Sequence, residues 1–305
     1  MPEGHSIRRL ALAFDELMVG ERLAVSSPQG RFAAGAELLD GHRLVRTDAH
    51  GKHLFLGFAG DDAAADDELR WLRVHLGLYG SWTFDGDSDF HGTHSIGAPR
   101  RRVAEQETAL APVVVEQGSW QLPEPRGAVR ARLVSRHGVA DLTGPMACEV
   151  ITPQEKAAAQ RRLGPDPLRE DGDAAAFVTE VRRRSRPVGE LLMDQAVIAG
   201  VGNIYRAEVL FRARVHPRRL GRNVPAATLR AMWADLELLM GDGVATGRIV
   251  TTEPADRQEE DDTWYVYHRT GRPCLRCGST VVEEQMAARR VFWCPREQRR
   301  PAVTA

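Results

Sequence analysis

Ala199-Gly200-Val201-Gly202-Asn203-Ile204-Tyr205-Arg206-Ala207-Glu208 joins two segments of helical periodicity. Its two glycines permit backbone angles that other residues avoid, and Asn203 is a favourable N-cap for the helix that follows. Free N–H groups at an exposed helix start can bind a phosphate. A plain connection between two helices explains the same residues, so the stretch predicts a helical domain and leaves its use open.

The region around this stretch is dominated by helical periodicity, and we assign it to one domain over residues 169–250. The helical pattern covers four segments, residues 174–181, 188–198, 204–214 and 226–240. Residues 151–168 precede this domain and are rich in proline and glycine, which indicates a linker.

Residues 1–150 carry a different pattern. A helix of roughly three turns is predicted near the start from the spacing of Ile7, Leu10, Ala11, Phe14 and Leu17. Short alternating or β-rich runs follow, separated by turns that contain Gly, Asp and Pro. They are residues 44–46, 53–58, 71–75, 81–84, 113–115, 130–134 and 139–142. This pattern favours an antiparallel sandwich or barrel.

The charge of the 305 residues sums to −1, so there is no overall signature of a nucleic-acid binder. The charges are nevertheless segregated. Acidic residues gather at 61–62, 66–68, 85–89 and 259–262, and arginines gather at 182–186 and between 289 and 300. Segregation of this kind suits a protein with one anion-facing cleft, although charge runs are usually solvated surface.

The sequence contains no apolar run near the ~20 residues that a membrane span requires, and no signal peptide precedes the first helix. We therefore expect a cytoplasmic protein that does not bind membranes.

The first four residues, Met1-Pro2-Glu3-Gly4, carry possible chemistry. Removal of Met1, which a small second residue permits, leaves a secondary amine beside the carboxylate of Glu3. An α-amino group titrates near pH ~7.7–8.0, so a useful fraction is an unprotonated nucleophile at neutral pH. Condensed with a sugar aldehyde at C1′, a proline nitrogen gives a cationic iminium, and Glu3 could shuttle protons.

Three of the four cysteines gather within residues 263–300, which we assign to a strand-rich hairpin module. Cys274-x2-Cys277 is followed after 16 residues by Cys294, the spacing of a zinc ribbon. Cys148 lies far away in the sequence and is expected to be a small buried apolar residue.

Taken together, Met1-Pro2-Glu3-Gly4, Gly51-Lys52-His53-Leu54, Gly200-Val201-Gly202-Asn203-Ile204-Tyr205 and the cysteine module closely resemble the formamidopyrimidine-DNA glycosylase and endonuclease VIII family. Glycine after Pro2-Glu3 is similar to the endonuclease VIII branch, whose members prefer oxidised pyrimidines. The resemblance implies an α+β multidomain fold: an N-terminal β-sandwich, a helical domain with a helix-two-turn-helix, and a C-terminal zinc-finger-like β-hairpin.

The resemblance also implies roles for individual residues. Pro2 matches the Schiff-base nucleophile and Glu3 the general acid and base. Lys52 matches a hairpin lysine that contacts phosphate near the lesion and assists catalysis, and Asn203 matches an asparagine that binds phosphate. Arg289 matches the phosphate-binding arginine at the hairpin tip, although the adjoining Arg290 could hold that place instead.

A wedge residue is expected as well, because a base inside a duplex must be flipped out before a proline nitrogen can reach its sugar. Leu78 and Tyr79 resemble the endonuclease VIII wedge, but an apolar turn packed in the sandwich explains them equally well. Gly77 departs from the pattern, which can have a bulkier polar residue there. His5-Ser6 departs too, since some relatives carry Pro-Glu, and His5 is either a pH-sensitive substitute or simply the start of the helix.

The metal site also departs from the family pattern, which places a fourth cysteine where this chain has Glu297. Because a carboxylate is an acceptable zinc ligand, we expect one structural zinc on Cys274, Cys277, Cys294 and Glu297. His268 or a water molecule could instead complete the site, and a hairpin that has lost its metal is the opposing hypothesis.

We therefore predict a bifunctional DNA glycosylase and abasic-site lyase of base excision repair. It would remove oxidised bases, pyrimidines preferred, through a Schiff base on Pro2 followed by β- and δ-elimination. The expected partner is double-stranded DNA with damaged bases or abasic sites, bound by a monomer in the cytoplasm at the nucleoid. A non-catalytic damaged-DNA-binding protein and a glycosylase that prefers oxidised purines are the alternatives.

Overall fold

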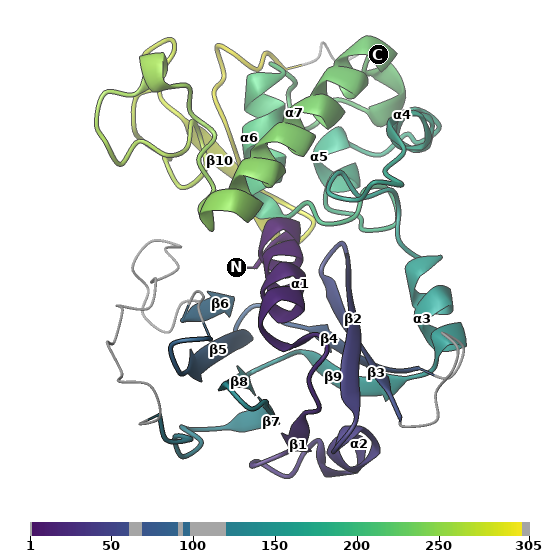
Figure 1. Ribbon diagram of the computed structural model, residues 1–305. Helices are drawn as coiled ribbons and strands as arrows, with labels where there is room; N and C mark the ends of the chain where they lie inside the picture. Colours follow the sequence, from purple (N-terminus) through teal and green to yellow (C-terminus); the bar gives the residue numbers. More distant parts are fainter. Residues whose placement is uncertain (1, 61–68, 91–93, 98–119, 301–305) are drawn as a thin grey trace. The chain divides into compact units, whose positions relative to one another are not determined.

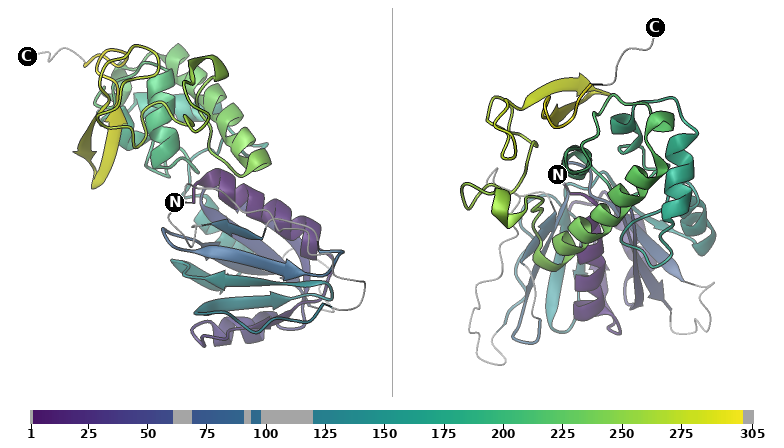
Figure 2. Two further views of the ribbon diagram at one scale, coloured as in Figure 1. Left: turned by 90° about the vertical axis from the view of Figure 1, so that its left-hand side faces the viewer. Right: turned by 90° about the horizontal axis from the view of Figure 1, so that it is seen from above.

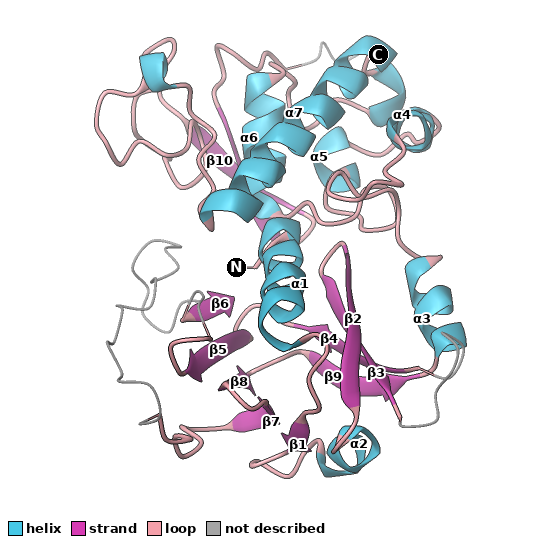
Figure 3. Cartoon of the chain, viewed as in Figure 1, coloured by secondary structure: helices cyan, strands magenta, loops and turns pink. Residues whose placement is uncertain are grey.

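The computed structural model describes residues 2–60, 69–90, 94–97 and 120–300, and the predicted strand at 113–115 lies outside these ranges. The chain divides into two compact units, Met1–Arg161 and Arg162–Ala305. Strands predominate in the first unit and helices in the second (Figure 3). None of the described helices is both long enough and apolar enough for a bilayer crossing.

The first unit contains three helices and nine strands among its described residues. They are α1 (Gly4–Met18), β1 (Ala24–Ser26), α2 (Ala33–Leu39), β2 (Arg43–His50), β3 (His53–Ala59), β4 (Arg70–His75), β5 (Ser81–Gly86), β6 (Ser95–Gly97), β7 (Val129–Val134), β8 (Gly138–Thr143), β9 (Ala147–Ile151) and α3 (Pro153–Gln160). The strands form two antiparallel sheets, in the orders β2-β3-β4-β9 and β1-β7-β8-β5-β6. The predicted sandwich is thus confirmed, and a barrel is excluded.

One apolar core joins the two sheets to α1. Leu56 and Leu72 of one sheet, Trp82 of the other and Phe14 of α1 are all 0% exposed. The Phe14 ring packs edge-on against Trp82, with 4.8 Å between centroids. Helix α1 contacts β2 and β6, which are edge strands of the two sheets (Figures 1 and 2). The predicted first helix is therefore confirmed as part of the core.

The outer face of the four-stranded sheet carries a second, smaller apolar cluster of Phe55, Leu69 and Trp71. Lys156 of α3 lies over the Trp71 ring at 4.3 Å and forms an ion pair with Asp48 at 2.6 Å. Both faces of β3 are consequently buried, which explains its nearly continuous apolar sequence. Helix α3 lies within residues 151–168, where we expected only a linker.

The second unit contains α4 (Ala174–Arg182), α5 (Val188–Leu191), α6 (Asn203–Arg212), α7 (Ala226–Thr246), β10 (Val282–Met286) and β11 (Arg289–Trp293). The prediction of one helix over 188–198 was wrong beyond Leu191. Asp194 accounts for the break, because its carboxylate accepts the N–H of Ala196 at 3.2 Å and its carbonyl accepts that of Val197 at 2.8 Å. A side chain that binds nearby backbone groups competes with the helix.

The hairpin β10–β11 packs against α6. Phe211 of α6 stacks on Tyr265 with 4.6 Å between centroids, and both lie in one buried cluster with Val281, Phe292 and Cys294. The strands are joined by a two-residue turn, Ala287-Ala288, in which both residues have positive φ angles of 47° and 60°. This geometry suits the right-handed twist of a hairpin. The predicted C-terminal hairpin is thus confirmed.

Candidate functional site

The N-terminal residues Pro2 and Glu3 directly precede α1. Glu3 is the N-cap residue, its carbonyl accepts the Ser6 N–H at 3.1 Å, and it is 0% exposed. The following turns of α1 bury Ile7 and Leu10 in the core. The helix therefore holds Pro2 and Glu3 on rigid structure.

Lys52 lies in the two-residue turn Gly51-Lys52 between β2 and β3, where His50 pairs with His53. Its position relative to Pro2 follows from how α1 runs along β2. The Gly20 N–H binds the Leu44 carbonyl at 2.7 Å, and the Thr47 hydroxyl binds Asp15 at 3.3 Å. The helix and the strand therefore run in opposite directions.

The remaining lengths place the two ends at the same level. From Thr47 to the turn, β2 advances about 13–17 Å, at 3.2–3.4 Å per residue. From Asp15 back to Gly4, α1 covers about 17 Å, at 1.5 Å per residue. The start of α1 and the Lys52 turn consequently lie at the same end of the first unit. Lys52 therefore shares this end with Pro2, which lies 50 residues earlier in the sequence, and with Glu3.

Two histidines beside Lys52 were not singled out from the sequence. His53 and His75 are paired across β3 and β4, with 4.9 Å between ring centroids. Burial, assisted by the positive charge of Arg73, lowers the pKa of His53 to about 3; burial and the charge of Lys52 lower that of His75 to about 4. Both rings are neutral at pH 7. His50 and His53, which flank the turn, were the available sequence signal.

His5 is the second residue of α1 and is 4% exposed. Its Nε2 lies 3.1 Å from the Ser6 hydroxyl. Burial, with a smaller contribution from the N-terminal charge, lowers the pKa of His5 to about 3. Because this ring stays neutral at pH 7, its burial favours the alternative that His5 simply begins the helix.

The candidate wedge lies in the turn between β4 and β5. Leu78 is 49% exposed and Tyr79 is 81% exposed, whereas Leu76 fills the core at 2%. The alternative that this turn simply packs inside the sandwich is therefore wrong for Leu78 and Tyr79. Two exposed apolar side chains on one tight turn are available for contact with another molecule.

Gly77 is explained by its surroundings. Its φ is +68°, and a Cβ on it would lie 2.9 Å from the Cβ of Met146. Met146 is 69% exposed, and its N–H binds the His75 carbonyl at 2.9 Å. It therefore adds a third exposed apolar side chain beside the wedge turn. Met146 could not be recognised from the sequence, because its neighbours are about 70 residues away in the chain.

In the second unit, Asn203 is the first residue of α6 and the N-cap is Gly202, so the predicted cap was off by one residue. The Asn203 side chain faces the hairpin instead: its Nδ2 donates to the Arg290 carbonyl at 3.1 Å. Arg289 directly follows the turn and pairs with Met286. Of the two arginines, Arg289 is thus the one directly beside the tip. Arg290 is one step further, with its guanidinium 3.2 Å from Nε2 of His268.

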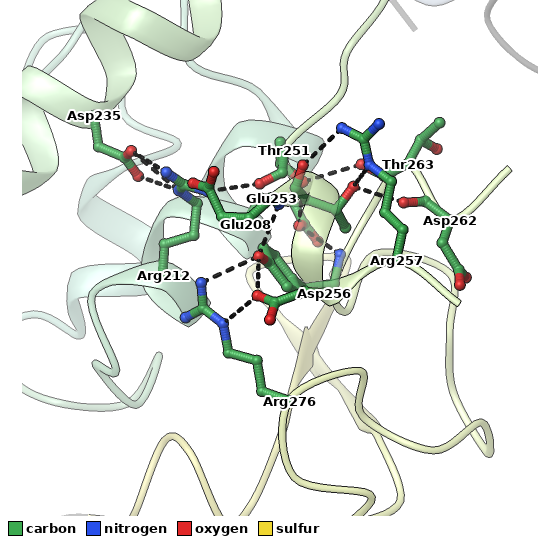
Figure 4. Close-up of polar contacts among 12 residues, drawn as sticks. Glu208, Arg212, Asp235, Thr251, Glu253, Asp256, Arg257, Asp262, Thr263 and Arg276 are labelled. Atoms are coloured by element: carbon green, nitrogen blue, oxygen red, sulfur yellow. Dashed lines mark hydrogen bonds and ion pairs between the residues drawn. The ribbon is translucent and has the colours of Figure 1, made fainter. Parts of the chain in front are cut away.

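Buried polar contacts hold the hairpin module to α6 (Figure 4). Glu208 is 0% exposed and accepts the N–H groups of Tyr265, Val266 and Tyr267 at 2.8–3.0 Å. It also accepts the Thr251 hydroxyl at 2.5 Å. Burial raises the pKa of Glu208, while these four hydrogen bonds oppose the rise.

Arg212, one turn further along α6, extends these contacts. Its guanidinium binds Asp235 of α7 at 2.7 Å, Glu253 at 2.9 Å and the Thr251 carbonyl at 2.7 Å (Figure 4). One face of α6 thereby fixes residues 251–267, which include the first residues of the hairpin module.

Cys274, Cys277 and Cys294 form a candidate metal site, with sulfur atoms within 4.8 Å of one another. The Cys277 and Cys294 sulfurs are 3.4 Å apart. Tetrahedral zinc with Zn–S bonds of about 2.3 Å sets its sulfurs about 3.8 Å apart, so these three thiols fit zinc after small shifts. The predicted clustering of the three cysteines is confirmed.

Glu297 and His268 are the two candidates for the fourth ligand. Neither has a ligand atom within 4.8 Å of all three sulfur atoms. Glu297 forms an ion pair with Arg214 at 3.2 Å. His268 stacks on Tyr267, with 4.3 Å between ring centroids. Glu297 would have to leave Arg214 to complete the site.

Comparisons with known proteins agree with this arrangement. Residues 1–111 match the model of the formamidopyrimidine-DNA glycosylase N-terminal domain, and residues 163–254 match that of the formamidopyrimidine-DNA glycosylase H2TH domain. The chain is 40% identical to Endonuclease 8 1 of Mycobacterium tuberculosis over 97% of this chain and 98% of that protein. It is 27% identical to formamidopyrimidine-DNA glycosylase of Roseiflexus, over 98% and 100%.

Among solved structures, the fold is similar to Lactococcus lactis Fpg in complex with DNA that contains an abasic site. The TM-score is 0.72 and the identity 19%, over 98% of this chain and 100% of that one. Fold and sequence together place the chain in a class of DNA glycosylases. The chain belongs to the formamidopyrimidine-DNA glycosylase and endonuclease VIII family. The identity of 40% with an endonuclease 8 agrees with the branch expected from the sequence.

Proposed function

We propose that this protein is a bifunctional DNA glycosylase and abasic-site lyase that removes oxidised bases, pyrimidines preferred. The Pro2 nitrogen attacks C1′ of the flipped nucleotide, and the bond to the damaged base breaks. Glu3 transfers protons to and from the sugar. The resulting iminium acidifies the neighbouring carbon, so β- and then δ-elimination of the two phosphates cut the strand.

The observation that carries this proposal is the shared position of Pro2, Glu3 and Lys52 at one end of the first unit. A nucleophile, a carboxylate and a cation at one place suit attack on a sugar that lies between two phosphates. The exposed side chains of Leu78 and Tyr79 suit filling the gap that the flipped nucleotide leaves. In the second unit, Asn203 and Arg289 are proposed to hold phosphates, and Arg290 to support the tip.

We further propose one structural zinc on Cys274, Cys277 and Cys294, with Glu297 as the fourth ligand once it leaves Arg214. The ion would hold the ends of the hairpin module together and would take no part in the reaction. The proposed partner is double-stranded DNA with damaged bases or abasic sites, bound by a monomer at the nucleoid in the cytoplasm.

The amines of the chain make the mechanism easy to test. The sequence has only two lysines, Lys52 and Lys156, so with the α-amine there are three amines that could form a Schiff base. Lys156 is held by Asp48 and is 14% exposed. Borohydride reduction with abasic-site or thymine-glycol DNA, followed by proteolysis and mass spectrometry, assigns the trapped sugar to one amine.

We expect the sugar on Pro2, with Pro2→Gly strongly reduced in trapping and Lys156→Arg unchanged as the matched control. A sugar on Lys52 would contradict the proposed nucleophile. Binding to damaged DNA without any adduct in the wild type would support the alternative, a non-catalytic damage-binding protein. Relative rates on thymine glycol and 8-oxoguanine duplexes distinguish the pyrimidine from the purine preference.

A further inference from the structure

Arg206 lies on the first turn of α6 and is fully buried, at 0% exposure. Its guanidinium donates to three oxygens. Nη2 donates to the Asn203 side-chain oxygen and, at 2.8 Å, to the Arg290 carbonyl, and Nη1 donates to the Gly189 carbonyl at 3.4 Å. One side chain thus joins α6, α5 and the strand β11 that follows the hairpin tip.

These contacts determine which way the Asn203 amide faces. A guanidinium only donates hydrogen bonds, so the atom that faces Arg206 must be the amide oxygen. The Arg290 carbonyl only accepts, so the atom that faces it must be Nδ2. Both neighbours therefore require the same orientation, which removes the usual ambiguity of an asparagine amide.

The orientation matters for binding an anion. A phosphate oxygen accepts hydrogen bonds, so Asn203 can bind it only through N–H groups. The Arg290 carbonyl takes one N–H of Nδ2, and the nitrogen carries two. With the oxygen held by Arg206, the amide offers a donor and not a carbonyl.

The same guanidinium also places the hairpin tip. Its acceptor, the carbonyl of Arg290, belongs to the residue directly after Arg289. Because this carbonyl is fixed, the backbone position from which the neighbouring Arg289 side chain extends is restricted. Arg206 therefore acts on both proposed phosphate contacts of the second unit.

A buried guanidinium is costly for the stability of the fold, because it loses its hydration. Replacing a whole buried charged network by apolar side chains of similar volume is often neutral or stabilising, whereas removing one member leaves its partners unpaired. A methionine could fill much of this space without that cost. The presence of arginine is thus better explained by its directed hydrogen bonds than by packing.

We propose that Arg206 is a positioning residue for phosphate binding: it fixes the Asn203 amide with its donor available and holds the backbone next to Arg289. This inference rests on the proposed function, since it assumes that Asn203 and Arg289 hold DNA phosphates. Arg206 itself touches no DNA.

The test is a double-mutant cycle on binding to a duplex with a tetrahydrofuran abasic analogue, measured by fluorescence anisotropy. We expect Arg206→Met to weaken binding about 10-fold, on the order of one hydrogen bond to a charged group. Its melting temperature should fall modestly, because the Asn203 and Gly189 oxygens lose a buried donor while the cost of burying the guanidinium disappears. In an Asn203→Ala background, Arg206→Met should cost much less than in the wild type, because one of the two groups it positions is already gone.

Arg212→Met is the matched control, since it removes another arginine of α6 that binds Asp235 and Glu253. It should lower the melting temperature and leave the affinity of the folded protein unchanged. If Arg206→Met does not fold, Arg206→Lys replaces it in the cycle. An ammonium lacks the planar fork that reaches three oxygens, so a smaller loss is expected, again suppressed by Asn203→Ala.

Unchanged affinity in Arg206→Met, or equal losses in both backgrounds, would overturn the inference. So would an equal loss of affinity in Arg212→Met, because the loss would then follow the lowered melting temperature and not the position of Arg206. These results would leave the proposed function standing. Absence of damage-specific binding by the wild type would instead refute the proposed function itself.

Discussion

Glu208 offers a direct measure of how strongly the hairpin module is held to α6. Its two carboxylate oxygens share four donors: Oε1 binds the N–H groups of Val266 and Tyr267, and Oε2 binds that of Tyr265 and the Thr251 hydroxyl. The substitution Glu208→Gln keeps the shape and exchanges one oxygen for an NH2 group.

The cost of this exchange can be worked out from the contacts. The amide oxygen can keep two backbone N–H groups, and the Thr251 hydroxyl can rotate to accept. The Tyr265 N–H, however, then faces another donor in a buried place, which costs about 1–3 kcal/mol. The two retained bonds weaken because the acceptor loses its charge, while the penalty for burying that charge disappears. We expect a net loss of about 2 kcal/mol for Glu208→Gln.

Glu208→Ala should cost roughly 4 kcal/mol or more, because it leaves all four donors without their acceptor and opens a cavity. The assay is denaturant unfolding of the full chain, followed by tryptophan fluorescence. Glu253→Gln is the matched control: Glu253 belongs to the same set of contacts, but its side chain is 54% exposed, so its loss should cost under about 1 kcal/mol. If Glu208→Gln destabilised the chain no more than Glu253→Gln, the proposed anchoring would be refuted.

Three further predictions concern other parts of the chain. Burial holds the pKa of His5 at about 3. Below about pH 6.5 this histidine is therefore protonated in the unfolded chain and neutral in the folded chain. The free energy of unfolding consequently falls by up to about 1.4 kcal/mol per pH unit between pH 6.5 and about pH 3. His5→Gln should therefore flatten the fall of unfolding free energy between pH 6.5 and 4.5, and parallel curves for both proteins would contradict this. Leu78→Ala should impair nucleotide flipping, measured with 2-aminopurine beside the lesion, while unfolding free energy stays within about 0.5 kcal/mol; Leu238→Ala, which removes a leucine of α7 that is 69% exposed, is the control, and equal flipping by both variants would argue against a wedge. Metal analysis of the purified protein should find close to one zinc per chain, and Glu297→Cys should hold it more tightly against a chelator; zinc absent after growth in metal-replete medium, with DNA cleavage intact, would show that the hairpin stands without metal.

Local sequence determined those features that depend on neighbours along the chain. The periodicity of Ile7, Leu10 and Phe14 is sufficient to define α1, because one apolar face of a helix needs only local spacing. The Gly51-Lys52 turn could likewise be predicted between two β-rich runs. The spacing of Cys274, Cys277 and Cys294 predicted their clustering, because it is the spacing of a zinc ribbon.

Features that depend on distant residues were decided by the tertiary structure. The sequence could not place the hairpin tip, because Ala287-Ala288 lacks the glycine or asparagine that usually marks such a turn. It gave no sign that Asn203 would turn from capping α6 to the Arg290 carbonyl, 87 residues away.

The burial of two charged side chains depends most clearly on the tertiary structure. On a helical pattern, Arg206 and Glu208 look like solvated residues, yet both are 0% exposed. Apart from Asn203, their partners come from residues 189, 251, 265–267 and 290, which lie nearby only after the second unit has folded. A buried charge is tolerable only where such hydrogen bonds compensate for lost hydration, and that compensation is a property of the assembled fold.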